Sequence, residues 1–387
     1  MVSFGIDNFI SYSRWKNSAV GLVTNHAATT KMLVPSRKAL LANGVNVVKL
    51  FSPEHGLDVK GADGHLMRDG IDALTNLPVV SLYSEKLAPS ADDLDDIDVV
   101  LFDIPDIGSR FYTYLWTLTH VLEACAANNK PLVILDRPNP VSGLFELAEG
   151  PILEESEASF IGRWPMPIRH SATLGELARY FNTKRHIGCD IEVVPCSNWQ
   201  RGMYQSDWET TFVATSPAIC RFEAMMLYPG LCLLEATNIS EGRSTELSFT
   251  AAGAPWLDAR RAAHVLQQIG LDELMVVETT FVPATGKYHG ELCRAVSFEV
   301  LQPEIFHPVF FGLLLIKLIR DLHPQHFQWQ PYPTLVNPSG RQHLDKLLGI
   351  PDSESLFELD LRLFLAKAKK ITGIADWAKE IKPFLLY

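Results

Sequence analysis

A carboxylate and an imidazole stand side by side in the stretch FSPEHGL, residues 51–57, as Glu54 and His55. The pair follows the apolar run VNVVKLF, in a short polar break. A carboxyl beside a histidine can transfer protons, bind a metal ion or simply belong to a charged loop. Little positive charge lies near Glu54 in the sequence, which favours a carboxyl that keeps a proton to donate. Glu54 and His55 are therefore candidate catalytic residues.

Hydrophobic patterning predicts the elements that position this pair. Short apolar, β-branched runs predict five strands in the first half of the chain, at residues 18–25, 45–51, 78–83, 96–103 and 131–136. Helix-compatible segments at 36–44 and 109–129 lie between them. Near-continuous apolar strands that alternate with helices indicate a parallel sheet covered on both faces. The sequence therefore predicts an α/β fold with a Rossmann-like N-terminal domain.

Polar clusters directly follow four of these strands. In open α/β sheets ligands bind outside the carboxyl ends of the strands, so we expect the clusters to converge on one crevice. Arg110 and Tyr112 stand near the predicted start of the 109–129 helix, a location suited to binding an anionic group. The catalytic candidates from this half are Glu54, His55, Asp103 and Tyr112. The substrate-binding candidates are Asn25, His26, Asp106, Arg110 and Asn139.

A change in composition marks a candidate domain boundary. Residues 141–172 are loop-like, so we expect domains at 1–150 and 151–387, with the boundary within 140–172. Thr173 and Glu176 then form the capping-box pattern that begins a helix. Further strands are expected at 190–195 and 275–283, and helices at 257–270, 307–323 and 353–371, the last capped by Ser353 or Ser355. This pattern predicts a smaller α/β or α+β C-terminal domain.

The loop NISEGRSTELSF, residues 238–249, adds Glu241 and Arg243 to the substrate-binding candidates. An arginine fork can bind a carboxylate through two parallel hydrogen bonds, so arginines are suited to an acidic substrate. The four arginines that could do this are Arg110, Arg137, Arg169 and Arg243.

Charge and hydropathy exclude several classes of partner. The formal net charge of the 387 residues is −11, and no basic run could follow a phosphate backbone, so nucleic acid is not an expected partner. The N-terminus does not resemble a secretory signal, and the longest apolar helix candidate, from Pro308, is too short to span a bilayer. We therefore expect a cytoplasmic protein without a membrane partner. The oligomeric state is not indicated.

Common cofactor and metal motifs are absent from the sequence. No glycine occurs between Gly21 and Gly44, where a dinucleotide-binding motif would lie, and no P-loop, GxSxG or HExxH motif is found. The six cysteines are scattered without metal-binding spacing. We therefore expect no cofactor and no metal. A metal-dependent hydrolase remains an alternative, because four residues could in principle surround one ion: Glu54, His55, Asp103 and Asp136.

Taken in order, many short motifs resemble those of the exo-β-N-acetylmuramidases of the NamZ type, glycoside hydrolase family 171. They include GLVTNHAA, LFSPEHGL, DVVLFDIPDIGSRFYTYLWTL, LDRPNP, SFIGRWPMPIRHSATLGELARYFN, SEGRSTELSF and FVPATGKYHGELCRAVSFEV. The resemblance implies a Rossmann-like domain joined to a smaller domain, with the site in the cleft between them. It also implies release of N-acetylmuramic acid from the non-reducing end of peptidoglycan fragments or muropeptide disaccharides during cell-wall turnover. This sequence differs from the family's usual residues at Pro105, Ser244 and Ser248. Members of the family are often exported.

The resemblance supplies a substrate and therefore a hypothesis for the site. Glu54 would protonate the leaving glycosidic oxygen, oriented by His55 or Tyr112, and Arg110 or Arg243 would hold the lactyl carboxylate of muramic acid. The second catalytic group would be Asp103, Asp106, Glu241 or the 2-acetamido oxygen of the substrate itself. The alternatives are the metal-dependent hydrolase and a protein that binds muropeptides without turnover.

Overall fold

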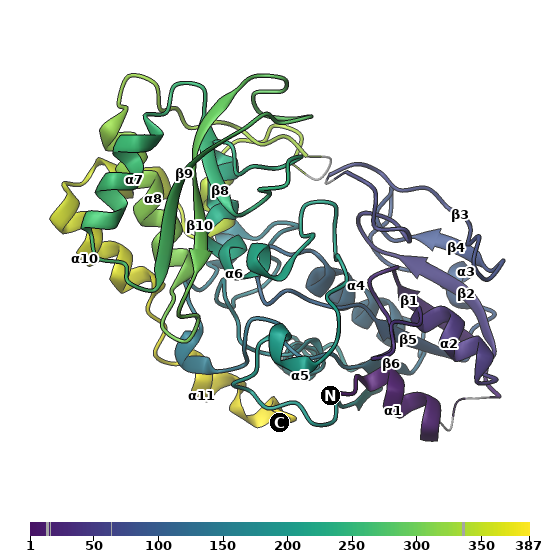
Figure 1. Ribbon diagram of the computed structural model, residues 1–387. Helices are drawn as coiled ribbons and strands as arrows, with labels where there is room; N and C mark the ends of the chain where they lie inside the picture. Colours follow the sequence, from purple (N-terminus) through teal and green to yellow (C-terminus); the bar gives the residue numbers. More distant parts are fainter. Residues whose placement is uncertain (13–14, 16, 63, 335–336) are drawn as a thin grey trace.

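The molecule consists of two parts, each built on its own sheet (Figure 1). The computed structural model describes residues 1–12, 15, 17–62, 64–334 and 337–387. The N-terminal elements, purple to blue in Figure 1, surround a seven-stranded sheet, and most of the green to yellow C-terminal elements surround a three-stranded sheet. The predicted α/β class with a second, smaller unit is confirmed.

The large sheet has the strand order β3-β4-β2-β1-β5-β6-β7. All neighbouring strands are parallel except the short edge strand β3. The chain places β2, β3 and β4 on one side of β1 and then returns to place β5 on the other side, so a topological switch point lies between β1 and β5. All five strands predicted in the first half are confirmed. The strands are β1 (Val20–Thr24), β2 (Val47–Ser52), β3 (Gly70–Ile71), β4 (Pro78–Ser81), β5 (Val99–Asp103), β6 (Leu132–Leu135) and β7 (Ile191–Val194).

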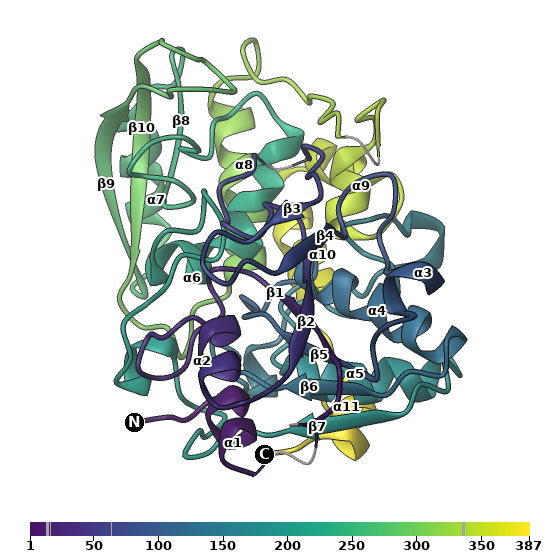
Figure 2. The same ribbon diagram turned by 90° about the vertical axis from the view of Figure 1, so that its right-hand side faces the viewer.

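The apolar runs are nearly continuous because this sheet is buried on both faces. In β5, Val99 and Leu101 belong to one hydrophobic cluster, whereas Val100 and Phe102 belong to another. Helices α1 (Gly5–Tyr12) and α2 (Ser36–Ala42) cover the first face, and α4 (Tyr114–Ala127) and α5 (Leu174–Lys184) cover the second (Figure 2). The side chains of a strand alternate between faces, so both faces require apolar residues.

The helix expected at 109–129 starts later than predicted, at Tyr114. The residues before it form a turn, in which Ser109 pairs with Arg169 through backbone hydrogen bonds. Arg110 and Tyr112 therefore precede the helix instead of forming its first turn. The capping box of Thr173 and Glu176 is confirmed at the start of α5.

The strand at 190–195 was expected in the second domain, but the structure places it in the first sheet. It is β7, which pairs in parallel with β6. The C-terminus also returns to this sheet, where the Tyr387 hydroxyl lies 2.8 Å from Asp136 Oδ2 and 2.7 Å from the backbone nitrogen of Cys196. We propose that the division between the two units lies after β7, and not within 140–172.

The second unit is an antiparallel sheet with helices packed on it. Its strand order is β8-β10-β9, with β8 at Ala251–Ala254, β9 at Leu274–Phe281 and β10 at Cys293–Val300. The expected strand at 275–283 and the helices at 257–270 and 307–323 are confirmed as β9, α7 (Ala259–Gln268) and α8 (Pro308–Leu322). The expected 353–371 helix is divided into a 3₁₀ turn, Ser353–Glu358, and α10 (Leu361–Thr372), which is capped by Asp360 and by neither predicted serine. The remaining helices are α3 (Ala91–Leu94), α6 (Phe222–Leu231), α9 (His343–Leu348) and α11 (Trp377–Ile381).

Two glycines let α6 and α8 cross closely. A Cβ atom at Gly230 would lie 1.9 Å from the Pro308 carbonyl oxygen, and one at Gly312 would lie 2.3 Å from the Gly230 carbonyl oxygen. No larger residue fits at either position without moving a helix. This crossing fixes the end of α6 and the 3₁₀ turn that follows it, which both contribute to the site described below. Among the described helices, none is both long and apolar enough to cross a membrane.

Candidate active site

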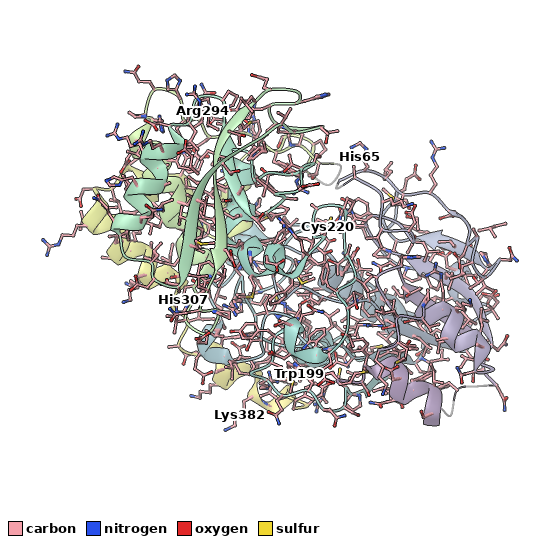
Figure 3. All side chains as sticks on the ribbon, in the orientation of Figure 1. His65, Trp199, Cys220, Arg294, His307 and Lys382 are labelled. Atoms are coloured by element: carbon pink, nitrogen blue, oxygen red, sulfur yellow. The ribbon has the colours of Figure 1, made fainter. Side chains whose placement is uncertain are left out.

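A pocket lies between the two units and is lined by residues of both. One wall comes from the carboxyl ends of the first sheet and the other from α6, α9 and the loops around them. The loop that carries His65 follows Glu54 and reaches towards the second unit (Figure 3), where a Cβ atom at Gly64 would lie 3.4 Å from Thr334. The lining residues with polar side chains are Glu54, His55, Tyr83, Tyr112, Thr113, Ser216, Tyr228, Glu235, Arg243, Tyr332, Thr334 and His343.

Both carboxylate oxygens of Glu54 are held by hydrogen bonds at this pocket. The backbone nitrogen of Gly64 donates to Oε1 at 2.8 Å, and the Thr113 hydroxyl donates to Oε2 at 2.6 Å. Thr113 stands at the start of α4, but its side chain makes no capping bond there, so its hydroxyl is available to Glu54. Glu54 is buried and fixed in one orientation.

His55 turns the chain so that Glu54 reaches the pocket. His55 and Gly56 have φ angles of 68° and 73°, two consecutive left-handed residues in the loop that follows β2. His55 Nδ1 lies 2.8 Å from the carbonyl oxygen of Gly61, which can only accept a hydrogen bond. Nδ1 therefore carries a proton, and in the neutral ring Nε2 is the acceptor. The strained turn and this bond orient the histidine within the pocket lining.

A second buried carboxylate, Glu235, lines the pocket from the opposite unit. It lies in the 3₁₀ turn Cys232–Ala236 after α6. Arg243 forms an ion pair with its Oε1, and His343 Nε2 lies 3.2 Å from its Oε2. The His343 ring is stacked on Tyr332, with ring centroids 4.8 Å apart. Glu235 is thus oriented by two basic side chains, as Glu54 is oriented by a hydroxyl and an amide.

Arg243 connects Glu235 to Glu241, which is not among the pocket-lining residues. Arg243 Nε donates to Glu241 Oε1 at 3.1 Å, and Lys287 Nζ lies 3.3 Å from Oε2. Burial opposes ionisation of Glu241, but Lys287 and Arg243 outweigh it and hold the pKa of this carboxyl below its ordinary value of 4.5. Beside the pocket, the acidic residues Glu235 and Glu241 are thus paired with the basic residues Arg243 and Lys287.

The lowered pKa of Glu241 predicts an effect on acid stability. Because the unfolded state binds a proton on Glu241 more readily than the folded state, the contribution of this residue is present above about pH 4.5 and is lost as the pH falls through the lower, folded pKa. Glu241→Gln should flatten the acid limb of the unfolding free energy against pH. Urea unfolding between about pH 3 and 7 measures this. An unchanged acid limb would contradict the ion-paired arrangement.

Tyr112, a catalytic candidate, lines the pocket, packed edge-on against Tyr114 and Tyr228 with ring centroids 4.9 and 6.0 Å away. Burial raises the pKa of its hydroxyl above the ordinary value of 10.0. The phenol therefore keeps its proton at neutral pH and can donate a hydrogen bond.

Arg110 does not reach the pocket lining, in contrast to its predicted role. Its guanidinium is fully buried and donates to the carbonyl oxygens of Pro151 and Met166 and, across the unit boundary, of Leu347. Burial without an acidic partner among the described residues lowers its pKa to about 9. Its contacts are those of a residue that ties α9 to the first unit.

Arg110→Met should therefore lower stability and leave substrate binding intact. Three buried carbonyl oxygens would lose their donors, and we expect the free energy of unfolding to fall by about 3 kcal/mol or more. Chemical denaturation gives this value, and KM of the folded fraction should change little. A raised KM with unchanged stability would restore Arg110 as a ligand-binding residue.

The remaining strand-end candidates are engaged in structural contacts. Asp103 is fully buried and accepts two hydrogen bonds from Arg137, at 2.6 and 3.1 Å, away from the pocket lining. Asn25 accepts from the backbone of Ala27, and Asn139 links Val141 to Ala172. These bonds engage Asp103 and Asn139, whereas the buried side-chain nitrogen of Asn25 has no hydrogen-bond partner among the described residues.

Three other predicted residues also lie away from this pocket. Exposed His26 has Nδ1 3.4 Å from Arg37, and the Arg169 guanidinium donates to the carbonyl oxygens of Phe306 and Val141. Asp106 lines a different pocket. The crevice at the strand ends therefore divides into two parts, and only four candidates share the first: Glu54, His55, Tyr112 and Arg243.

The ligand set of the metal alternative is not gathered at one point. Asp103 is bound to Arg137, whereas Asp136 accepts from Thr173, Gly175 and Tyr387. Glu54 and His55 make the separate contacts described above. Across the described ranges no group of three metal-binding side chains is found.

Sequence reasoning missed Glu235 and His343. Glu235 lies in GLCLLEA, an otherwise apolar stretch, and a buried acid in such a run is itself a signal because unpaired buried carboxylates are rare. His343 offers no comparable signal, since its partner Glu235 is 108 residues away.

Three residues differ from those that the family usually has at the same positions: Pro105, Ser244 and Ser248. Pro105 lines the same pocket as Asp106. Ser244 has a φ of 63°, a conformation in which glycine would be unstrained, and its hydroxyl lies 2.6 Å from that of Thr285. Ser248 is buried, and its hydroxyl has no partner among the described residues.

Comparison with known proteins identifies relatives of this chain. Residues 20–223 match the N-terminal domain of exo-β-N-acetylmuramidase NamZ, and residues 226–387 match its C-terminal domain. The chain is 38% identical to the peptidoglycan β-N-acetylmuramidase NamZ of Bacillus subtilis (strain 168) over 331 residues, which are 85% of this chain and 80% of that protein.

Solved structures agree with this assignment. Two DUF1343 family proteins from Bacteroides fragilis NCTC 9343 superimpose with TM-scores of 0.88 and 0.74 at 26% and 27% identity, in each case over 100% of this chain and 99% of the other. The fold, the ordered motifs and both domain matches lead to one conclusion: the chain belongs to the NamZ family of exo-β-N-acetylmuramidases.

Proposed function

We propose that this chain is a glycosidase that releases terminal N-acetylmuramic acid from the non-reducing end of peptidoglycan fragments. The observation that carries the proposal is a pair of buried glutamates, Glu54 and Glu235, which line one pocket from two units. Glycosidases commonly use two carboxyl groups on either side of the scissile bond. The relative from Bacillus subtilis, whose name states that activity, supports the choice of substrate.

In this proposal Glu54 is the general acid. A hydroxyl can accept a hydrogen bond as well as donate one, so Thr113 keeps its contact when the proton is on Oε2 of Glu54. The proton passes to the glycosidic oxygen as the bond to the sugar breaks. Gly64, on the other oxygen, prevents the carboxyl from rotating away.

Glu235 takes the place of the three earlier candidates for the second group. Asp103 and Asp106 are turned to other contacts, and Glu241 supports Arg243. A carboxylate held by Arg243 and His343 can stabilise the positive charge that develops on the sugar ring, or attack or activate water at the anomeric carbon. In this proposal Arg243 orients Glu235, and its predicted contact with the lactyl group is secondary.

One incubation separates the three functional classes considered. The protein is mixed with a MurNAc-GlcNAc disaccharide, with and without a chelator, and the products are separated by chromatography. We expect free N-acetylmuramic acid in both samples. Loss of product with chelator would favour a metal-dependent hydrolase, and binding without product would favour a muropeptide-binding protein.

We also propose that the protein acts in the cytoplasm. The six cysteines are all free thiols, which fits a reducing compartment. Cell fractionation with an antibody against the chain tests this, and recovery outside the cytoplasmic fraction would contradict it.

A further inference from the structure

A surface groove adjoins the active-site pocket at Gly64, which lines both. The groove is lined by two segments of the first unit, residues 64–69 and 84–86, and we call it the outer groove. His65, labelled in Figure 3, marks its position on the side of the first unit that faces the second. The catalytic proposal above leaves the outer groove without a role.

The outer groove is held in place by contacts with the end of β4 and with the loop after β2. The backbone nitrogen of Met67 donates to the carbonyl oxygen of Tyr83 at 2.8 Å, and that of Ser81 donates to Asp69 Oδ1 at 2.8 Å. The Met67 side chain packs on the loop after β2, where a Cβ atom at Gly61 would lie 2.6 Å from its sulfur. The outer groove therefore has a fixed position relative to the loop that carries the proposed general acid.

The active-site pocket is closed around the Tyr228 ring. Three other lining residues have ring centroids within 6.0 Å of that ring: Phe111, Tyr112 and Phe249. All four side chains are buried. Gly64 and Thr334 are only half-buried, so the pocket opens to solvent where the outer groove begins. A terminal sugar suits such a pocket, and the rest of a saccharide chain must leave through the open side.

The position of Glu54 directs the leaving part of the substrate to the outer groove. A general acid must lie beside the oxygen of the leaving group, because it gives that oxygen its proton. The backbone nitrogen of Gly64, at the inner end of the outer groove, donates to Oε1 of Glu54 at 2.8 Å. The leaving chain therefore emerges from the pocket next to Gly64.

The side chains of the outer groove suit a sugar. Arg68 and Glu85 are exposed and oppositely charged, and neither forms an ion pair with another residue that the structure describes. Together they offer hydrogen-bond donors and acceptors, and the hydroxyl groups of a sugar pair with both. Arg68 can also meet the lactyl carboxylate of a muramic acid. Leu66 is 50% exposed, which leaves an apolar side chain to pack against the carbon–hydrogen face of a sugar ring.

We propose that the outer groove binds the second sugar of the leaving chain, so that the protein prefers peptidoglycan fragments longer than a disaccharide. This inference rests on the proposed function, because it takes Glu54 as the general acid. The terminal N-acetylmuramic acid and the first leaving sugar occupy the pocket, and the next sugar contacts Leu66, Arg68 and Glu85. Binding energy gained at a distance from the broken bond stabilises the transition state and raises kcat/KM.

A competition experiment with the intact protein tests the preference. MurNAc-GlcNAc and MurNAc-GlcNAc-MurNAc are mixed at equal concentration, and the products GlcNAc and GlcNAc-MurNAc are followed by mass spectrometry. Because the two substrates compete for the same enzyme, the ratio of their initial rates is the ratio of their kcat/KM values. We expect the trisaccharide to react about tenfold faster. A ratio near one, with the disaccharide cleaved, would overturn this inference alone, whereas cleavage of neither substrate would overturn the proposed function as well.

One double variant and one control assign the preference to the outer groove. Leu66→Ser combined with Arg68→Ala removes an apolar and a charged contact at exposed positions, so the fold should hold and the ratio should fall to about threefold or less. Arg294→Ala changes an exposed arginine of β10, away from the groove, and should keep the full ratio (Figure 3). Both substrates are measured in one sample, so a partial loss of folded protein does not alter the ratio. A full ratio in the double variant would contradict the assignment.

Discussion

Glu54→Gln should lower kcat on the disaccharide MurNAc-GlcNAc, whose leaving sugar oxygen must be protonated, by about 10² to 10⁴, the usual contribution of general acid catalysis. Glutamine has nearly the shape of glutamate but no acidic proton to give to the leaving oxygen. Its amide can still accept from Gly64 and donate to the Thr113 hydroxyl, so the two contacts that hold residue 54 can survive. The loss should therefore appear in kcat with little change in stability or in substrate affinity.

Thermal unfolding of Glu54→Gln is the control for this experiment. A melting temperature close to that of the unmodified protein shows that the pocket is intact. A substrate with a very acidic leaving group should recover much of the lost rate, because such a group needs little protonation. Activity within about tenfold of the unmodified protein, on a substrate with a poor leaving group, would remove Glu54 from the catalytic role.

Glu235→Gln should also lower kcat, by about 10² or more, because the negative charge that faces the developing positive charge on the sugar is removed. Arg243 would keep Glu241 as its partner, so we expect the local structure to hold. Added azide should partly restore turnover in Glu235→Ala, since a small anion can enter the space left by the side chain and attack the anomeric carbon. The stereochemistry of the glycosyl azide then reports on the mechanism.

His343→Phe is the matched control for Glu235. Phenylalanine can keep the stack on Tyr332 but loses the 3.2 Å contact to Glu235, so we expect only about a tenfold loss. If the kcat of Glu235→Gln stayed within about tenfold of that of the unmodified protein, the assignment of Glu235 as the second catalytic group would be wrong. The substrate's own acetamide would then be the second group.

The first half of the fold could be predicted because its strands carry their own signal. Each is an apolar run buried on both faces, and the polar break after β2 places Glu54 at the carboxyl edge of the sheet. The four-residue strand β8 and the eight-residue strand β10 were not predicted. β8 is AAGA, in which small residues allow close packing: a Cβ atom at Gly253 would lie 2.7 Å from that of Ala295. Its pairing with β10, not its own composition, makes it a strand.

The site could be predicted only in part, because a polar residue does not reveal its partner. Asp103 and Arg110 both stand at the expected edge, yet Asp103 is bound to Arg137, 34 residues away, and Arg110 is bound to carbonyl oxygens as far away as Leu347. Arg243 was, like Arg110, a candidate for binding an acidic substrate, and it does line the pocket. Glu235 enters the site only through the close crossing of α6 and α8, which depends on Gly230 and Gly312.

The most direct test of the central claim compares two isomeric disaccharides, MurNAc-GlcNAc and GlcNAc-MurNAc, by mass spectrometry of the products over time. We expect free N-acetylmuramic acid from MurNAc-GlcNAc alone, and with Glu54→Gln we expect its release from that isomer to be slower by about 10² or more. Cleavage of GlcNAc-MurNAc at a similar rate, or cleavage of MurNAc-GlcNAc by Glu54→Gln at nearly the unmodified rate, would contradict the central claim.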